Sequence, residues 1–453
     1  MSLIKFDFDF GKFKTIFHRR LVSDRFVCSR LIFKNDGLYF KVIKPNSVSH
    51  SDLDIALGWI HIPCQLDIER PFGVAYDAVA NHLEKGFRDL EFEYDSSADT
   101  PTLGFRFTLK GERVSHQVDA CSVSYNIDDV LPLKAESFME GGQFYEAVNQ
   151  VLFATDDDNG YVLSGVAMHG NSVVATDGIV LIKRYNDNQP IFDKPFVVPH
   201  PFCTLLQKTG KIKIGKSKST TRYLVIDFEY LGIPIILYAL SEGSRYPNYK
   251  RILVNDDVWY NPVCKIAAQD AEAIQKHISK LPTSRLDNRS DKKYVLLACY
   301  DGRLCIDSIS QEENNTRLVC SASSICHPML SEHGYAIFAC IDRFKGLMLP
   351  TDINIECQLN NELDKDQLPE PDDFNECLLF KSNLYEGALM AFAVTLKEFP
   401  KDCVFTVKSN SIKTEATNHL TKTLPITTTI ELDSKQQKTS KPTPLGALFS
   451  AEG

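Results

Sequence analysis

The stretch QFYEAVNQVLFATDDDNGYVLSGVAMHGNSVVATDGIVLIKRY, residues 143–185, decides the expected fold. It begins with an amphipathic helix, in which apolar residues such as Phe144 and Val148 recur on one face. It ends with two apolar, β-rich runs that are separated by Asp177-Gly178. Glycine readily adopts the positive φ that a tight turn requires, so this dipeptide predicts a β-hairpin.

The same unit, a helix followed by alternating strands with short turns, recurs along the chain. Helical periodicity is found at residues 9–23, 76–87, 141–156, 199–210, 261–281 and 340–349. Two units per domain predict three domains, with boundaries near residues 133 and 255. The expected fold class is α+β, with repeated domains at 1–133, 134–255 and 256–399, each with two helices packed on antiparallel sheets. Residues 400–453 are dominated by Thr, Lys, Ser and Pro, which predicts a mostly disordered tail.

The composition is that of a globular protein, with 453 residues, 43% hydrophobic and 24% charged. A net charge of -9 argues against a surface coated in positive charge, although a local basic lining remains compatible with it. The thirteen cysteines include no Cys-x-x-Cys pair and no zinc-ligand spacing, so we expect reduced core cysteines in a cytoplasmic protein. The start of the chain is acidic where a signal peptide needs an apolar block, and the longest apolar stretch, YLGIPIILYAL, is too short to span a bilayer. We therefore expect neither export nor membrane insertion.

The segment GKIKIGKS, residues 210–217, satisfies the pattern of a phosphate-binding P-loop letter for letter. A P-loop needs a buried strand before it and a helix after it, so that free backbone N–H groups converge on the phosphates. Here a helical pattern precedes the segment and a β-branched, aromatic run follows it. The context favours a basic hairpin, and a P-loop NTPase is kept as an alternative.

Residues 143–185 resemble the middle domain of the bacterial sliding clamp, the β subunit of DNA polymerase III. The family pattern is a helix ending in Phe-Ala, an L-x-G-V strand and an ATDG hairpin, which matches residues 153–154, 163–166 and 175–178. The segment SRYPNYKRILV, residues 244–254, resembles the end of the same family domain. Length, helix order and the final strand ALMAFAVTL extend the resemblance over residues 1–399.

The chain departs from the family directly after the hairpin glycine. Clamps usually carry His-Arg there, whereas this chain has Ile179-Val180. The departure concerns the polar side of the family's peptide pocket, and it suits a divergent clamp encoded by a phage or a mobile element.

The resemblance implies a non-catalytic DNA sliding clamp that forms a ring. Two copies would join head to tail as a homodimer around double-stranded DNA, without sequence preference, and would be served by a clamp loader and hold a DNA polymerase. No Ser-His-Asp, paired-carboxylate or metal-ligand pattern stands out in the sequence, so we expect no enzyme activity, no cofactor and no metal. A non-ring interaction scaffold with the same fold is the second alternative.

A ring that slides needs positive charge that faces the phosphates, without base-specific contacts that would trap it at one sequence. Helices that line the channel are therefore expected to carry Lys and Arg, although an ordinary solvated face explains any single one equally well. The candidates lie on or beside the expected helices, or, for Arg25, match a family position: Lys12, Lys14, Arg19, Arg20, Arg25, Lys85, Arg88, Lys208, Lys265, Lys276, Arg343 and Lys345.

In the family, the hairpin helps to form an apolar pocket where short peptides of polymerases and other clients dock. The alternative for the matching residues is a core between two domains. The matching positions are Leu163, Thr176, Gly178, Leu181, Pro247, Arg251 and Ile252, with Val394 and Leu396 added from the last strand. Burying one client Leu or Phe contributes about 1.5–3 kcal/mol.

The tail contains one apolar cluster, Leu445, Leu448 and Phe449. It resembles the Leu-rich, Phe-ending peptides that clients insert into clamps, but it lacks the leading Gln and its spacing is one residue looser. Chance hydrophobicity is the alternative. If the cluster docks, the tail competes with client peptides for the pocket.

Overall fold

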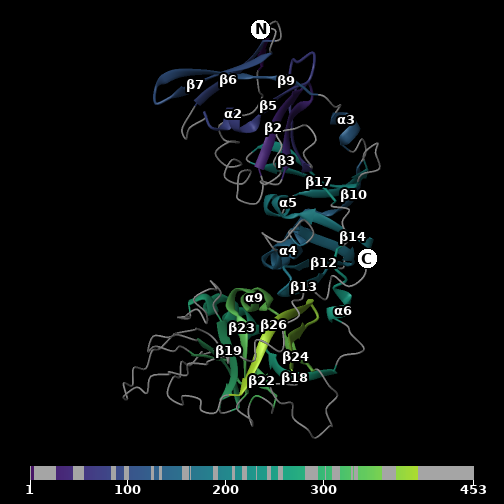
Figure 1. Cartoon of the computed structure of the whole chain (residues 1–453), viewed down its shortest axis with the longest axis vertical. Helices are drawn as coiled ribbons and strands as arrows, with labels where there is room; N and C mark the ends of the chain where they lie inside the picture. The colour runs from purple at the N-terminus through teal and green to yellow at the C-terminus, as the bar shows by residue number, and fades with distance from the viewer. Residues whose placement is uncertain are drawn as a thin grey trace, which may run out of the picture. The chain divides into compact units, whose positions relative to one another are not determined.

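A computed structural model describes residues 2–4, 27–43, 56–82, 88–95, 101–123, 127–131, 135–155, 163, 165–186, 192–206, 210–216, 222–230, 232–241, 246–253, 259–280, 294–300, 302–308, 317–327, 330, 335–359 and 374–395. Their contacts form two compact units (Figure 1). The N-terminal unit comprises Met1–Asn149, Asp157–Ser172 and Asn186–Tyr246, and the C-terminal unit comprises Gln150–Asp156, Val173–Tyr185 and Pro247–Gly453. The predicted helix at 9–23 and the predicted tail lie outside the described residues.

A nine-stranded antiparallel sheet forms the centre of the N-terminal unit. In spatial order its strands are β10 (Ala135–Glu140), β15 (Lys211–Lys216), β16 (Arg222–Tyr230), β17 (Ile233–Leu240), β4 (Ala56–Pro63), β3 (Gly37–Ile43), β2 (Val27–Lys34), β5 (Phe72–Ala75) and β9 (Cys121–Ser122). Strands β17 and β4 pair with Tyr238 opposite Trp59. The sheet thus runs without interruption across the domain boundary predicted near residue 133.

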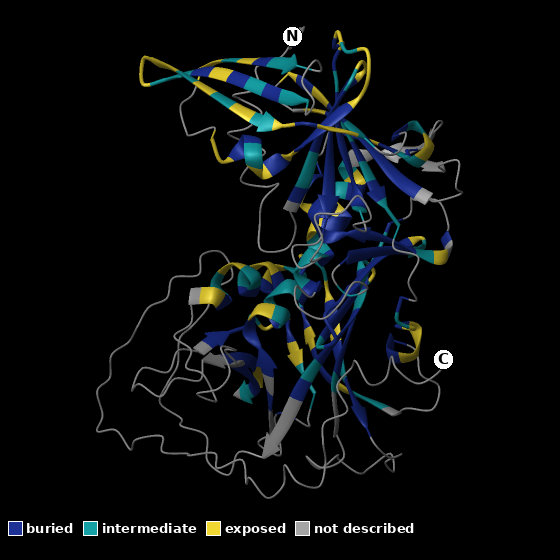
Figure 2. Cartoon of the chain, turned by 45° about the horizontal axis from the view of Figure 1, so that its top comes forward, coloured by how far each residue is buried: buried dark blue, intermediate teal, exposed yellow. Residues whose placement is uncertain are grey.

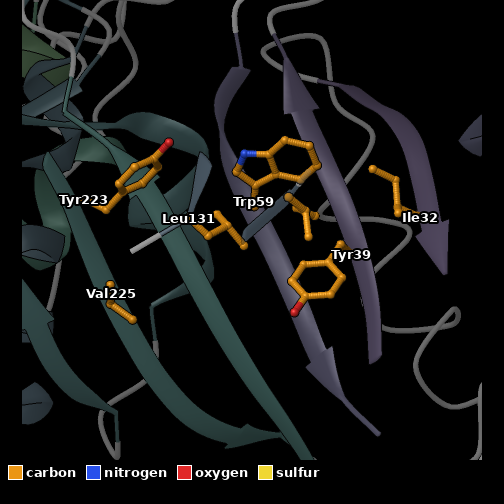
Figure 3. Close-up of a cluster of buried hydrophobic side chains, with 7 residues drawn as sticks. Ile32, Tyr39, Trp59, Leu131, Tyr223 and Val225 are labelled. Carbon is orange, nitrogen blue, oxygen red and sulfur yellow. The ribbon is translucent and has the colours of Figure 1, made fainter. Parts of the chain in front are cut away.

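One face of this sheet carries a cluster of buried aromatic and aliphatic side chains (Figure 3). Trp59 on β4 and Tyr39 on β3 lie on one side of Leu131, and Tyr223 on β16 lies on the other. Trp59 is only 2% exposed. Because removing apolar surface from water drives folding, this cluster ties strands from the two sides of residue 133 together.

A second, four-stranded sheet of the N-terminal unit has the order β1 (Ser2–Ile4), β6 (Arg88–Asp95), β7 (Thr102–Leu109) and β8 (Glu112–Asp119). Burial alternates along β7, where Phe105 and Phe107 are buried, and Figure 2 shows the resulting stripes. Lys110 and Gly111 join β7 to β8 with φ of 51° and 89°. Two successive positive φ values define a type I′ hairpin turn.

The remaining elements of this part of the chain are short. They are α2 (Tyr76–Ala80), α3 (Ile127–Val130), α4 (Gly141–Val151), α5 (His200–Leu205) and the paired strands β11 (Gly165–Gly170) and β14 (Phe192–Pro199). None of the helices in the described residues is long and apolar enough to span a membrane.

The C-terminal unit is built around β26 (Tyr385–Thr395), its longest strand. One run of neighbouring strands is β12 (Ser172–Thr176), β13 (Val180–Tyr185), β26, β23 (Tyr335–Cys340), β19 (Tyr294–Tyr300), β20 (Arg303–Ser308) and β21 (Arg317–Val319). A second run of neighbouring strands starts at β26 and continues with β25 (Phe374–Lys381), β24 (Ile353–Leu359), β18 (Trp259–Ile266) and β22 (Ile325–Cys326). The pairing of β13 with β26 carries the sheet across the boundary predicted near residue 255.

Short helices cover the strands of the C-terminal unit. They are the 3-10 turn η1 (Leu152–Ala154), α6 (Lys250–Leu253), α7 (Ala268–His277) with its extension η2 (Ile278–Lys280), and α9 (Ile341–Leu347). Helix α9 packs against β23 and β26 (Figure 1). It also contacts α7, η2 and η1.

The predicted helices at 141–156 and 340–349 are confirmed as α4 with η1 and as α9. The helix predicted at 199–210 is confirmed only over α5, which ends at Leu205. The helix predicted at 76–87 extends, in the described residues, only over α2. The helix predicted at 261–281 is wrong at its start, because Asn261–Ile266 belong to β18, where they pair with β24. Side chains of Val263, Cys264 and Ile266 are buried there, and the helix begins at Ala268.

The hairpin interpretation of the P-loop-like segment is confirmed. Residues 211–216 form β15, which pairs with β16 so that Gly215 lies opposite Tyr223 and Lys216 opposite Arg222. The backbone N–H and C=O groups of a paired strand are committed to its neighbours, so they do not form the free cradle that a phosphate requires.

Candidate functional site

The predicted hairpin at Asp177-Gly178 is present between β12 and β13. Gly178 has φ 85°, as the sequence predicted. The Asp177 carboxylate holds the turn, since its Oδ1 accepts hydrogen bonds from the backbone N–H groups of Ile179 and Val180, both at 2.8 Å. The N–H of Gly178 donates to Thr176 Oγ1 at 3.1 Å. The turn is therefore fixed by its own side chains.

The second oxygen of Asp177 binds an arginine from a distant helix. Arg343, on α9, directs Nε and Nη2 at Asp177 Oδ2, at 2.8 Å and 2.6 Å. The Asp177 side chain is 3% exposed and that of Arg343 is 31% exposed. Burial alone would lower the pKa of Arg343, but the Asp177 carboxylate outweighs it and raises that pKa. The pair fastens the hairpin to α9.

Helix α9 also lies unusually close to the segment that follows α4. A Cβ added at Gly346 would lie 2.3 Å from the ring of Phe153 in η1. Real side chains do not approach this closely, so glycine is needed for the helix to contact Phe153. The Phe-Ala pair that ends the predicted helix is thus packed against α9.

Strand β13 joins the hairpin to β26. Leu181 lies opposite Ala388, and Ile179 O accepts a hydrogen bond from Met390 N at 3.0 Å. Val180 and Leu181 are fully buried. Ile179 and Val180 stand where clamps usually carry His-Arg. Val180 begins a strand of the apolar core, and Ile179 is half-buried in the turn before it.

A polar cluster lies where the end of β13 pairs with the start of β26. Lys183 on β13 forms an ion pair with Glu386 on β26, with Nζ and Oε2 2.9 Å apart. The Lys183 ammonium also lies 4.9 Å from the ring centroid of Tyr185. Burial and then a hydrogen bond to Glu386 raise the pKa of the Tyr185 hydroxyl.

The structure brings most of the predicted pocket residues to β26. Thr176 is the last residue of β12, Gly178 is in the turn that follows, and Leu181 is on β13. Arg251 and Ile252 are in α6, which packs against β26, with Arg251 exposed and Ile252 buried. Pro247 precedes α6 and is half-buried.

The other pocket candidates are less fully described. Leu163 is half-buried and belongs to the N-terminal unit. The backbone of Val394 is part of β26, opposite Ala336, and its side chain is outside the described set. Leu396 lies outside the described residues, as do the tail residues Leu445, Leu448 and Phe449.

Three of the candidate DNA-binding residues lie on the neighbouring helices α7 and α9. Lys276 on α7 is exposed. Lys345 on α9 donates to Ser279 Oγ of η2 at 2.8 Å, and Arg343 is committed to Asp177 as described above. Lys345 is half-buried.

Two further candidates lie on strands, whereas the sequence predicted a helix for Lys265 and placed Arg88 directly after one. Lys265, on β18, is exposed and forms an ion pair with Asp352 at 3.2 Å. Arg88 is the first residue of β6 and is exposed. The remaining candidates are outside the described residues: Lys12, Lys14, Arg19, Arg20, Arg25, Lys85 and Lys208.

Sequence reasoning missed the contacts of Asp177 and Phe153. The sequence does indicate that Asp stabilises a turn, because Asp side chains accept hydrogen bonds from the backbone two residues ahead. It gives no indication that the same carboxylate binds Arg343, which is 166 residues away. Among the described residues, no group of three or more His, Cys, Asp or Glu is arranged to hold a metal ion.

The sequence matches no protein-family model, and it matches no curated protein. Solved structures give a different result. The chain is similar to the β sliding clamp of Caulobacter crescentus, with a TM-score of 0.55 and 14% identity over 87% of this chain and 100% of that one. The DNA polymerase III β subunit of Thermotoga maritima gives a TM-score of 0.54 and 13% identity, over 87% of this chain and 100% of its own.

The chain has the sliding-clamp fold. A third similar structure with this fold is the DNA polymerase III β subunit of Borrelia burgdorferi, in complex with a natural product, with a TM-score of 0.53 and 13% identity. The match covers 86% of this chain and 98% of that one. The sequence identity to these structures is only 13–14%. The shared fold confirms the α+β architecture that the repeat predicted.

Proposed function

We propose that the protein is a DNA sliding clamp, which encircles double-stranded DNA as a head-to-tail homodimer and tethers a polymerase without catalysing a reaction. The observation that carries the proposal is the sliding-clamp fold over 98–100% of the length of solved clamps. The three predicted domains would give six per ring. A clamp loader and a cytoplasmic location belong to the same proposal.

Two edge strands support closure of a ring. Among the described strands, β8 lies at the end of the four-stranded sheet and β21 at the end of the run that begins with β12. Edge strands present unpaired N–H and C=O groups, which a second chain can pair with. In the proposed dimer, β8 of one copy pairs with β21 of the other at each of two equivalent junctions, as closed symmetry requires.

A substitution on β8 tests this junction. The two-residue turn at 110–111 makes Leu109 and Glu112 a hydrogen-bonded pair, so the alternation along the hairpin directs the N–H of Ser115 away from β7. Ser115→Pro would remove that donor, whereas Ser115→Ala keeps it and is the matched control. We expect light scattering to give a dimer for the wild type and Ser115→Ala, and a shift to monomer for Ser115→Pro. A monomeric wild type at micromolar concentration would favour the scaffold alternative.

Positive charge on the helices supports DNA binding. Lys276 and Lys345 lie on α7 and α9, elements that pack side by side. Contacts to phosphates release counterions, so affinity should fall steeply with salt. We expect Lys276→Gln to reduce the salt dependence of DNA binding, and Lys211→Gln, an exposed change on β15, to serve as the charge-matched control.

We propose that clients dock beside the hairpin, between β13 and α6. Both elements contact β26, and both carry residues that match the family pocket. Leu181→Asp is a poor test, since Leu181 is fully buried and a buried charge destabilises the fold itself. Arg251→Ala changes an exposed side chain of α6 and should weaken binding of a Leu- and Phe-containing client peptide by about tenfold, equivalent to about 1.4 kcal/mol. Lys250→Ala, exposed on the same helix, is the control, and equal affinity in both variants would exclude this pocket wall.

The tail motif remains part of the proposal. Deleting residues 441–453 should tighten the binding of a client peptide, because a tethered competitor would be removed. Phe449→Ala should reproduce the effect. Unchanged affinity in both variants would leave the tail without a docking role.

A further inference from the structure

Five cysteines from distant parts of the sequence gather in the C-terminal unit. Electrostatic contacts connect their side chains to one another, and they come from β18, β19, β20, β22 and the residue that follows β21. They are Cys264, Cys299, Cys305, Cys320 and Cys326. The sequence predicted reduced core cysteines, and only the fold reveals that five of them gather in one cluster.

Cys326 is at the centre of the cluster. It lies directly opposite Cys264 in the antiparallel pair of β22 and β18. The N–H of His327 donates to Val263 O at 2.9 Å, so the adjacent pair, Cys264 and Cys326, occupies a non-hydrogen-bonded position. Side chains approach each other most closely at such positions, at a Cα separation of about 4.5 Å, within the range that disulfides span.

The thiol of Cys326 is in direct contact with a third cysteine. The side chains of Cys299 and Cys326 are hydrogen-bonded to each other. Both residues are half-buried, whereas Cys264, Cys305 and Cys320 are buried. The Cys299 and Cys326 pair is therefore the part of the cluster that a small solute reaches from the solvent.

The cluster is not arranged as a metal site. Within the described part of the chain, no three His, Cys, Asp or Glu side chains converge as metal ligands. The thiols of Cys299 and Cys326 are in contact, half-buried and on separate strands. This arrangement suits a reaction between two thiol groups.

We propose that Cys299 and Cys326 form a dithiol site that is oxidised by a peroxide to a disulfide, which would link β19 to β22. The thiolate of one cysteine attacks the peroxide O–O bond, giving a sulfenic acid and releasing water once the leaving hydroxide takes up a proton. The second thiol then attacks the sulfenic sulfur, the S–S bond forms, and a second water leaves. In total, two thiols are oxidised and hydrogen peroxide is reduced to two water molecules. The proposal is independent of the clamp function.

The surroundings set the rate of this reaction. The hydrogen bond with Cys299, and then burial, raise the pKa of the Cys326 thiol. Only the thiolate is nucleophilic, so the site is expected to react slowly at neutral pH and about tenfold faster for each pH unit of increase. The site is therefore resistant to brief oxidation and responds to sustained exposure.

The test is mass spectrometry of the full-length protein after incubation with hydrogen peroxide at pH 8. The intact mass should fall by two hydrogen atoms, and return after treatment with a thiol reductant. Trypsin cleaves after Arg303 and Arg317, so the disulfide should join the peptide 294–303 to the peptide 318–343, with fragmentation assigning Cys326. The linked peptide should be lost in both Cys299→Ser and Cys326→Ser.

Cys121→Ser is the matched control, since Cys121 is the exposed cysteine on β9 of the other unit and should leave the linked peptide unchanged. Cys264→Ser should also leave it unchanged. A link between residues 264 and 326, or oxidation of Cys299 or Cys326 to sulfinic acid without any link in the folded wild-type protein, would overturn the proposal.

Discussion

Arg343 and Asp177 form an ion pair with both Nε and Nη2 of the arginine on one carboxylate oxygen, at 2.8 Å and 2.6 Å. The other oxygen of Asp177 accepts two backbone N–H groups of its own turn. One buried carboxylate therefore sets the shape of the hairpin and fixes helix α9 against it. The sequence alone would place Arg343 on a DNA-facing surface. In the structure, Arg343 instead helps to hold the C-terminal unit together.

Removing either partner of this pair should destabilise the protein, and removing Asp177 should cost more than removing Arg343. Arg343→Met should cost about 1.5–3 kcal/mol in the free energy of unfolding, the usual range for hydrogen bonds to charged groups. Asp177→Ala should cost about 3–5 kcal/mol, since it leaves two backbone donors and a half-buried cation without their acceptor. Denaturant unfolding of both variants and of the double variant gives the coupling energy. Additive losses would show that the two residues act separately.

Gly346→Ala should destabilise the protein although alanine is the better helix former. Propensity would favour the change by about 1 kcal/mol. The new Cβ would meet the Phe153 ring at 2.3 Å, and overpacking of this kind typically costs about 1–3 kcal/mol. The double variant with Phe153→Leu should recover part of the loss. A thermal unfolding midpoint of Gly346→Ala equal to or above that of the wild type would contradict the packing of α9 on η1.

Acidification should weaken the N-terminal unit through His61. Its ring stacks on Tyr39 at 4.0 Å between centroids, with the strands β3 and β17 on either side of it. Burial lowers the pKa of His61, against a smaller opposing effect of Asp36. The unfolded chain, with a pKa near 6.5, therefore binds the proton first, and stability falls as the pH drops below 6.5.

The slope contributed by His61 is at most about 1.4 kcal/mol per pH unit. Denaturant unfolding between pH 7.5 and pH 5 measures it, and His61→Phe, which keeps the stacked ring, should have a shallower slope. His116 also has a lowered pKa, from burial and then His82, so His116→Phe is the comparison that isolates His61. Equal slopes in the wild type and His61→Phe would remove His61 from this role.

The hairpin of β15 and β16 should not bind nucleotides. Its backbone is paired, with Lys213 opposite Val225, so no loop is free to surround a phosphate. Titration calorimetry with ATP and Mg²⁺ should give no heat of binding for the wild type. Measurable binding that is lost in Lys216→Ala would restore the NTPase alternative.

Local patterns predicted the parts of the fold that local forces determine. The turn at Asp177-Gly178 follows from the positive φ of Gly178, and the helix α4 follows from its apolar face, with Phe144 and Val148 buried. The strands β15 and β16 alternate as their sequence does. In each case the residues that decide the structure are neighbours in the chain.

Contacts between distant residues decided the rest. Helix α7 starts at Ala268, and not at residue 261, since its first N–H groups find acceptors on other segments: Ala267 N donates to Ser324 Oγ at 3.0 Å and Ala268 N to Asp352 Oδ1 at 2.9 Å. No capping residue precedes the helix in the sequence to mark this start. The Arg343 ion pair and the cysteine cluster likewise depend on partners that only the folded chain brings together.

A threading experiment tests, without a clamp loader, whether the protein encircles DNA. Protein is mixed with a linear duplex that carries biotin at both ends, the ends are then blocked with streptavidin, and the complex is passed over a sizing column at a salt concentration that removes purely electrostatic binding. We expect the protein to stay with the end-blocked DNA, to leave it after a single internal cut by a restriction enzyme, and not to be retained on the same DNA with open ends. Equal retention on blocked and open DNA, or retention that survives the cut, would contradict a sliding ring.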